Sequence, residues 1–117
     1  MRRRRAAGQG SPRRTRALEL VWTDRALRDL QAIDAYISAD NPGAAARWIG
    51  RLLAAAERAA RAPLAGRVVP EKGRAEVREV LVRTYRVVYR VREARIDVLT
   101  VFEGHRLFPS DVSPEDD

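Results

Sequence analysis

The sequence contains no cysteine and a single histidine, His105. Without cysteine the chain has no disulfide framework and no thiolate ligands for a metal. One histidine excludes a multi-histidine metal centre, and a zinc site built from carboxylates alone would be unusual. The motifs of nucleotide-binding loops, dinucleotide-binding folds, serine hydrolases and zinc proteases are also missing. The sequence therefore predicts neither a metal nor another cofactor.

Long apolar segments are missing as well, since no run approaches the roughly 20 residues of a membrane span. Arginines at residues 2–5 resemble the charged start of a signal peptide, but no apolar segment follows them. We therefore expect no membrane insertion and no export, and we expect the protein to work in the cytoplasm.

Lysine is nearly absent too: Lys72 is the only lysine, whereas the sequence has 22 arginines. Codon bias in a GC-rich genome is the ordinary explanation of such an excess. The net charge of +7 comes entirely from residues 1–17, which hold seven arginines and no acid. The rest of the chain has 16 basic and 16 acidic residues, so a nucleic-acid function cannot rest on the isoelectric point.

This charge distribution divides the chain into three segments. Residues 1–17 have too few apolar side chains to fold alone and are predicted to form a disordered basic arm. The arm is either a contact to nucleic acid or a passive extension. Residues 18–109 are predicted to be the folded domain, and the acidic residues 110–117 are predicted to form a frayed tail.

A short apolar run at 18–22 predicts a strand, and two amphipathic helices follow it. The first helix, 24–39, is capped by Thr23 or Asp24, and Asn41 caps the second, which runs from Pro42 to about residue 62. Both have apolar residues at helical spacing. The first stripe is Ala26, Leu27, Leu30, Ile33 and Ile37, and the second is Ala45, Trp48, Ile49, Leu52, Leu53 and Ala56.

Alternation of apolar and polar residues then predicts three strands, at 77–82, 85–92 and 95–103, separated by short turns. The predicted fold is therefore α+β with the order β-α-α-β-β-β. Its small antiparallel sheet packs against the helix hairpin on one face, because both helical stripes must be buried. Residues 64–75 are predicted to be a loop.

Arginines gather on one face of the second of these strands and just after the third. Arg86 and Arg90 lie on that face, and His105 and Arg106 follow the last strand, so together they form a candidate surface for binding a target or a phosphate. The alternative is a solvated face on which these arginines pair with acids of neighbouring strands. Tyr85 and Tyr89 are predicted to face the core. Glu71 is predicted to pair with an arginine of the sheet.

Four segments carry a resemblance to a known family, namely GRVVPE at 66–71, VREVLV at 77–82, YRVVYRV at 85–91 and IDVLTVFEGHRLFP at 96–109. Over roughly residues 18–109 the chain resembles the RelE/ParE toxin superfamily, most of all its ParE branch. The resemblance implies a toxin of a bacterial type II toxin–antitoxin pair that forms a hetero-oligomer with its antitoxin. The antitoxin is expected to dock along the helix hairpin and the sheet. We expect its contacts at Leu30, Ile37, Trp48 and Leu52.

The two branches of the superfamily imply different targets. ParE toxins act on DNA gyrase without being enzymes, whereas RelE toxins cleave mRNA in the ribosome. Arg86 matches the strand arginine of the cleaving members, and Arg106 matches their arginine near the end of the last strand. The final tyrosine of those members is missing here, and His105 could substitute for it. The lysine pair of the cleaving members is absent. We therefore favour gyrase as the target, and the alternatives are a ribonuclease or an inactive family member.

Overall fold

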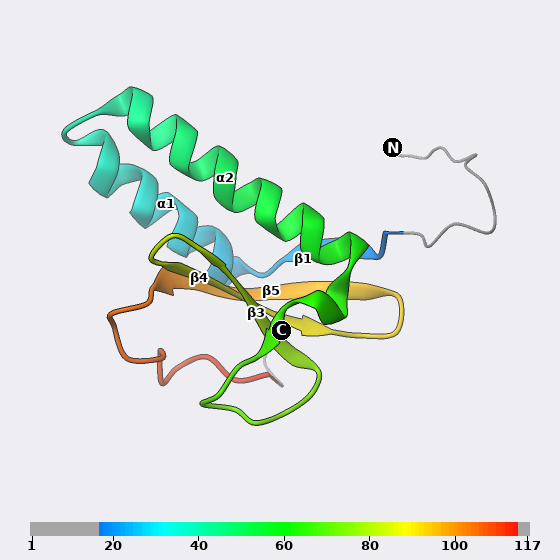
Figure 1. Cartoon of the computed structure of the whole chain (residues 1–117). Coiled ribbons are helices and arrows are strands. Elements are labelled where there is room, and N and C mark those ends of the chain that lie inside the picture. Colours follow the sequence, from blue (N-terminus) through cyan, green and yellow to red (C-terminus); the bar gives the residue numbers. More distant parts are fainter. Residues whose placement is uncertain (1–16, 115–117) are drawn as a thin grey trace, which may run out of the picture.

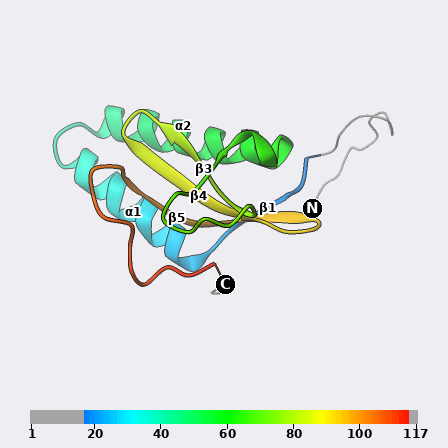
Figure 2. The same ribbon diagram turned by 60° about the horizontal axis from the view of Figure 1, so that its bottom comes forward.

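The computed structural model of the protein describes residues 17–114. Two long helices lie side by side across one face of a twisted sheet, as the two views show (Figures 1 and 2). In chain order the elements are β1 (Glu19–Trp22), α1 (Asp24–Ser38), α2 (Pro42–Arg61), the short 3-10 helix η1 (Pro63–Ala65), β2 (Arg67–Val68), β3 (Val77–Val82), β4 (Tyr85–Val91) and β5 (Arg95–Glu103).

Side-chain caps start both helices. The Thr23 hydroxyl accepts a hydrogen bond from the backbone N–H of Ala26 at 3.2 Å, and the Asn41 side chain accepts one from Ala44 at 3.0 Å. Each cap satisfies a backbone donor that the first helical turn leaves without a partner. The helix starts predicted from the sequence are confirmed. Within residues 17–114, neither helix is long and apolar enough to cross a membrane.

The sheet has five strands in the order β1-β5-β4-β3-β2. Strands β3, β4 and β5 are antiparallel neighbours, whereas β1 pairs with β5 in parallel and so forms one edge. The predicted α+β fold with a helix hairpin on a sheet is confirmed, but the sheet is mixed rather than antiparallel throughout. Between the parallel strands β1 and β5 the chain passes through both helices and then β2, β3 and β4, which is more than long enough for the connection that a parallel pair requires. The predicted loop at 64–75 contributes η1 and the short edge strand β2.

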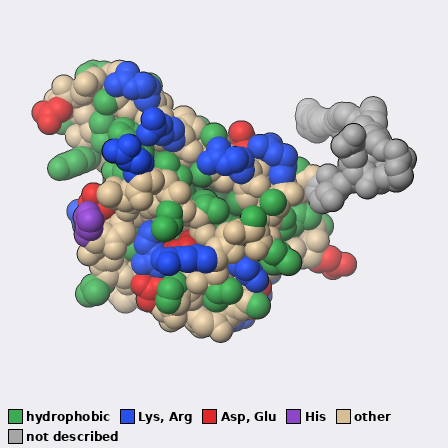
Figure 3. All heavy atoms as spheres, in the orientation of Figure 1, with side chains coloured by type: hydrophobic (Ala, Val, Ile, Leu, Met, Phe, Trp, Pro, Cys, Tyr) green, Lys and Arg blue, Asp and Glu red, His purple; other side chains and the backbone are tan. Residues whose placement is uncertain are grey.

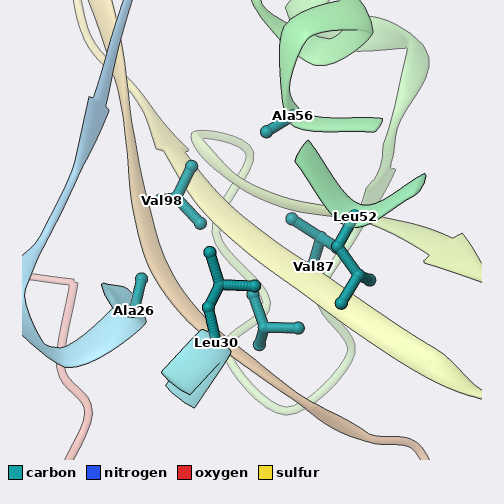
Figure 4. Close-up of a cluster of buried hydrophobic side chains, with 7 residues drawn as sticks. Ala26, Leu30, Leu52, Ala56, Val87 and Val98 are labelled. Atoms are coloured by element: carbon teal, nitrogen blue, oxygen red, sulfur yellow. The ribbon is translucent and has the colours of Figure 1, made fainter. Parts of the chain in front are cut away.

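The main core lies between the helices and the sheet. Leu30 of α1 and Leu52 of α2 meet Val87 and Val98 of the central strands, and Ala26 and Ala56 let the backbones approach closely (Figure 4). Leu52 has no exposed surface and Leu30 is 7% exposed. The centres of both apolar stripes are therefore buried as the periodicity predicts, whereas Leu27 and Leu53 at their margins are 43% and 38% exposed.

A second core covers the opposite face of the sheet. Val88, Leu99 and Phe102 point into it from β4 and β5, Val69 covers them from the loop before β3, and Val112 covers them from the end of the chain. Figure 1 shows this loop and the chain end passing beneath the sheet. The alternative is wrong in predicting a solvated face, since Val88 is fully buried. Its predicted pairing with an acid of a neighbouring strand is confirmed, because Arg86 of β4 binds Glu79 of β3.

The end of the described chain is held in place rather than frayed. Val112 is 6% exposed, the Asp111 carboxylate pairs with Arg25, and the carbonyl of Pro114 accepts a hydrogen bond from Arg90 at 2.7 Å. The prediction of a frayed tail is therefore wrong for residues 110–114. Residues 115–117 and 1–16, on which the rest of the tail and the basic arm were predicted, lie outside the described residues.

Candidate functional site

A buried ionic cluster lies on the face of the sheet opposite the helices. Both terminal nitrogens of Arg86 bind the two carboxylate oxygens of Glu71, at 2.7 and 2.9 Å. Its Nε donates to Glu79 at 2.6 Å, and Arg67 donates to the second oxygen of Glu79 at 2.5 Å. Arg86 is 7% exposed and Glu79 1%. A forked arginine between two carboxylates is a strong and geometrically specific arrangement.

Aromatic rings complete the surroundings of Arg86. Its guanidinium carbon lies 5.0 Å from the ring centre of Phe102 and 5.7 Å from that of Phe108. The hydrogen bond from Arg86 lowers the pKa of Glu71 to about 2, and the same bond raises the pKa of Arg86. The predicted pairing of Glu71 with a sheet arginine is confirmed. Arg86 is thus enclosed by carboxylates and rings, and its charge is neutralised within the fold.

The Glu71–Arg86 pair predicts a loss of stability in acid. A carboxyl group whose pKa is lower in the folded state stabilises the fold above its unfolded pKa. That contribution is lost as the pH falls from about 4.5 toward about 2. We expect Glu71→Gln to lose about 1 kcal/mol at neutral pH, a modest value because solvent screens a side chain that is 41% exposed.

Urea denaturation at several pH values tests this. The wild type should lose stability more steeply than Glu71→Gln as the pH falls through this window, and the two curves should converge in acid. Parallel curves would contradict a stabilising role for the pair.

An open cleft lies on the other side of the sheet, between α1 and the chain that follows β5. It has a volume of about 830 Å³, and its walls include Arg25, Ile33, Tyr36, Tyr85, Arg106 and Leu107. Tyr36 is 81% exposed and Leu107 92%. Large apolar and aromatic side chains with this exposure are typical of surfaces that bind another molecule.

The two arginines of the cleft differ in their ion pairs. Arg25 is held by Asp29 at 3.0 Å and also pairs with Asp111, whereas Arg106 forms no ion pair with any other residue of the described chain. The ring of Tyr85 rests edge-on against Trp48 with 5.5 Å between ring centres. Burial and the nearby Glu103 raise the pKa of Tyr85, while the charge of Arg106 acts in the opposite direction. Arg106 is therefore the available cation of this aromatic cleft.

The residues predicted for target binding do not form one surface. Arg86 is buried in the ionic cluster, and Arg90 is half-buried with one terminal nitrogen bound to Pro114. His105 and Arg106 are both exposed in the turn after β5. Only Arg106 of the four lines the cleft. Among residues 17–114, no group of three or more histidine, cysteine or acidic side chains is placed to hold a metal.

Sequence reasoning missed two tyrosines of the cleft. Tyr85 packs against the core as predicted, but it is only half-buried and also forms part of the wall of the cleft. Tyr36 lies beside the apolar stripe of α1 rather than in it. An aromatic residue on the polar side of an amphipathic helix is the signal that indicates its exposure.

The four residues predicted to contact an antitoxin also separate into two pairs. Leu30 and Leu52 are core residues, so a partner cannot reach them while the core stays closed. Ile37 and Trp48 are half-buried and keep some surface.

Comparison with known proteins agrees with the fold. A chain of the chromosomal ParDE TA system from P. aeruginosa superposes with a TM-score of 0.62 at 22% identity, covering 74% of this chain and 96% of that chain. This likeness defines the class of fold, a helix hairpin packed on a mixed sheet.

Sequence comparison identifies the family. Residues 20–108 match the model of the ParE toxin of the type II toxin–antitoxin system parDE. Two curated relatives are each 38% identical to this chain. Y4kP of Sinorhizobium fredii, a candidate toxin by its name, matches over 75% of this chain and 90% of its own length. Toxin RelE2 of Caulobacter vibrioides matches over 76% of this chain and 98% of its own length. The chain belongs to the ParE toxin family of type II toxin–antitoxin systems, and this family implies an antitoxin partner.

Proposed function

We propose that this toxin binds DNA gyrase in the cytoplasm and blocks it by protein–protein contact, without cutting a nucleic acid itself. The observation that carries the proposal is the state of Arg86. This residue matches the strand arginine of the RNA-cleaving members, yet both of its sides are bound by Glu71 and Glu79. A guanidinium that is neutralised and 7% exposed is poorly placed to stabilise charge on a substrate phosphate.

The cleft is the surface we propose for the target. Arginine and tyrosine dominate the binding energy of many protein interfaces, because they combine apolar contact with directed hydrogen bonds. Arg106, Tyr36 and Tyr85 provide that combination around one hollow. His105 lies beside Arg106 in the sequence and extends this surface. Arg86 and Arg90 support the sheet beneath it rather than touching the target.

The antitoxin is proposed to use the helix hairpin and the far edge of the sheet. Ile37 and Trp48 offer partly exposed apolar contacts on the hairpin, with Leu30 and Leu52 supporting them from the core. At the edge, β2 pairs only with Arg78 and Glu79 of β3, so β2 leaves the outer edge of 80–82 uncovered. An extended segment can add to such an edge as a further strand.

A paired assay tests the proposed target. Purified protein is incubated with gyrase and relaxed plasmid, and in parallel with translating ribosomes and mRNA. We expect loss of supercoiling or trapped cleaved plasmid, with intact mRNA, and addition of the antitoxin should reverse the effect.

Cut mRNA with normal supercoiling would instead establish the ribonuclease alternative, which the name of the relative RelE2 and the adjacent His105 and Arg106 favour. Arg86, His105 and Arg106 would then be the residues to test as catalytic groups. Inactivity in both assays would contradict the proposal and indicate an inactive family member or another target.

A further inference from the structure

All four arginines of α2 lie along one side of the helix. Arg47, Arg51, Arg58 and Arg61 are exposed and fall within an arc of about 80° around the helix axis. They span about 21 Å along that axis. We call these four residues the α2 arginine stripe. Figure 3 shows lysine and arginine side chains in a row over α2, along the upper edge of the molecule.

The stripe is not neutralised by the fold. Within residues 17–114 none of its members forms an ion pair, and the one interaction is that of Arg51, which lies 5.3 Å from the ring centre of Trp48. Glu57 is the only acid of the helix and lies at the margin of the arc. Several arginines elsewhere in the described chain differ, since Arg25, Arg67 and Arg86 all bind carboxylates. Four aligned charges that repel one another carry a cost unless a partner of opposite charge approaches.

The basic arm joins the fold at one end of this stripe. The backbone N–H of Leu18 donates to the carbonyl of Ala60 at 2.8 Å, so the chain enters the described fold next to the last turn of α2, which holds Arg58 and Arg61. Residues 1–16 carry seven arginines and no acid. The seven arginines of residues 1–16 therefore precede, in the sequence, the point at which the chain meets this end of the stripe.

We propose that the α2 arginine stripe binds the phosphate backbone of duplex DNA without reading its sequence. A straight row of guanidinium groups suits a duplex, which carries one negative charge for about every 1.7 Å of its axis. Within the arc the only other residues are Gly43 and Ala54, which are small, so the helix backbone can approach the duplex closely. The proposal holds whichever target the toxin inhibits.

Two other partners fit the stripe less well. A single-stranded nucleic acid is bound through aromatic platforms as well as charge, and the arc of the stripe has no aromatic residue. A protein partner needs apolar anchors at the centre of its interface, whereas the arc holds only glycine and alanine besides its arginines. Binding energy on this face must come almost entirely from charge.

Fluorescence anisotropy with a labelled mixed-sequence duplex of about 20 base pairs, measured over a range of salt concentrations, tests the proposal with the full chain. The variant Arg51→Gln/Arg58→Gln removes two charges from the stripe. The variant Arg28→Gln/Arg83→Gln removes two exposed charges elsewhere and gives the same net charge. Glutamine preserves helix propensity, and thermal melting verifies that both variants are folded.

We expect the stripe variant to bind about 10-fold more weakly at about 100 mM salt, and the slope of log affinity against log salt to fall by about 1.8. The matched control should retain the affinity and slope of the wild type. Equal weakening of both variants would overturn the proposal, because the effect would then follow net charge alone. Unchanged DNA binding with lost antitoxin binding in the stripe variant would also overturn it and assign the face to the protein partner.

Discussion

Replacing Arg106 with alanine is expected to weaken the toxicity of the protein by about 10-fold, which corresponds to about 1.4 kcal/mol of binding energy. Arg106 is exposed in the turn after β5 and is the one cation of the cleft that forms no ion pair within the described chain. Its removal leaves the cleft without an available positive charge but disturbs no contact of the core. Growth inhibition at matched expression levels, over a series of inducer concentrations, measures the effect.

The matched control for this variant is Arg28→Ala, which removes another exposed arginine that does not line the cleft. It should be as toxic as the wild type. Both variants should still co-purify with the antitoxin, because neither residue is among the contacts proposed for that partner, which are Ile37 and Trp48 on the hairpin and the outer edge of 80–82. Full toxicity of Arg106→Ala would contradict the assignment of the cleft to the target.

Replacing Leu52 with aspartate is expected to abolish folding, whereas the same change at the adjacent Leu53 should be tolerated. Leu52 has no exposed surface and packs between α1 and the sheet, so the new carboxylate would be buried without a partner. We expect a loss of more than about 4 kcal/mol, which is most of the stability of a small domain. Leu53 is 38% exposed, and its replacement should cost about 1 kcal/mol or less.

Soluble yield and thermal melting of the two variants provide the comparison. The Leu53→Asp protein controls for the charge itself and for the helix propensity of aspartate, since both sites lie in the same turn of α2. A cooperative melting transition for Leu52→Asp near that of the wild type would show that the burial of this side chain is not what holds the helix hairpin on the sheet.

The helix hairpin and the three consecutive strands could be predicted from the sequence because their signals are local. Thr23 and Asn41 mark helix starts, and the stripe that contains Leu30 has a clear helical period. The parallel pairing of β1 with β5 is different, because it joins residues 19–22 to residues 95–98. The sequence of a short apolar strand does not indicate which other strand will pair with it.

The second core escaped prediction for a related reason. Val69 and Val112 cover the sheet from an irregular loop and from the chain end, where no periodicity marks a buried residue. Without that cover, alternation along β4 indicates that Arg86 faces water. The cover brings Glu71 over Arg86 and turns a predicted binding residue into a structural one. Arg106 is exposed because it lies in the turn that follows β5, where no further segment of the described chain covers it.

The cleft combines one residue that the sequence identifies with two that only the fold brings to it. The available charge of Arg106 was visible in the sequence, but its neighbours Tyr36 and Tyr85 come from α1 and β4, about 50 positions apart in the chain, and only the packing of α1 against the sheet brings them together.

The most direct measurement of the central claim is the affinity of the purified full-length toxin for gyrase, determined for the wild type, Arg106→Ala and Arg28→Ala. The account predicts binding by the wild type and by Arg28→Ala, and about 10-fold weaker binding by Arg106→Ala. The absence of gyrase binding by the wild type would contradict the proposed target. Equal affinity of all three proteins would show that the toxin reaches gyrase through a surface other than the cleft.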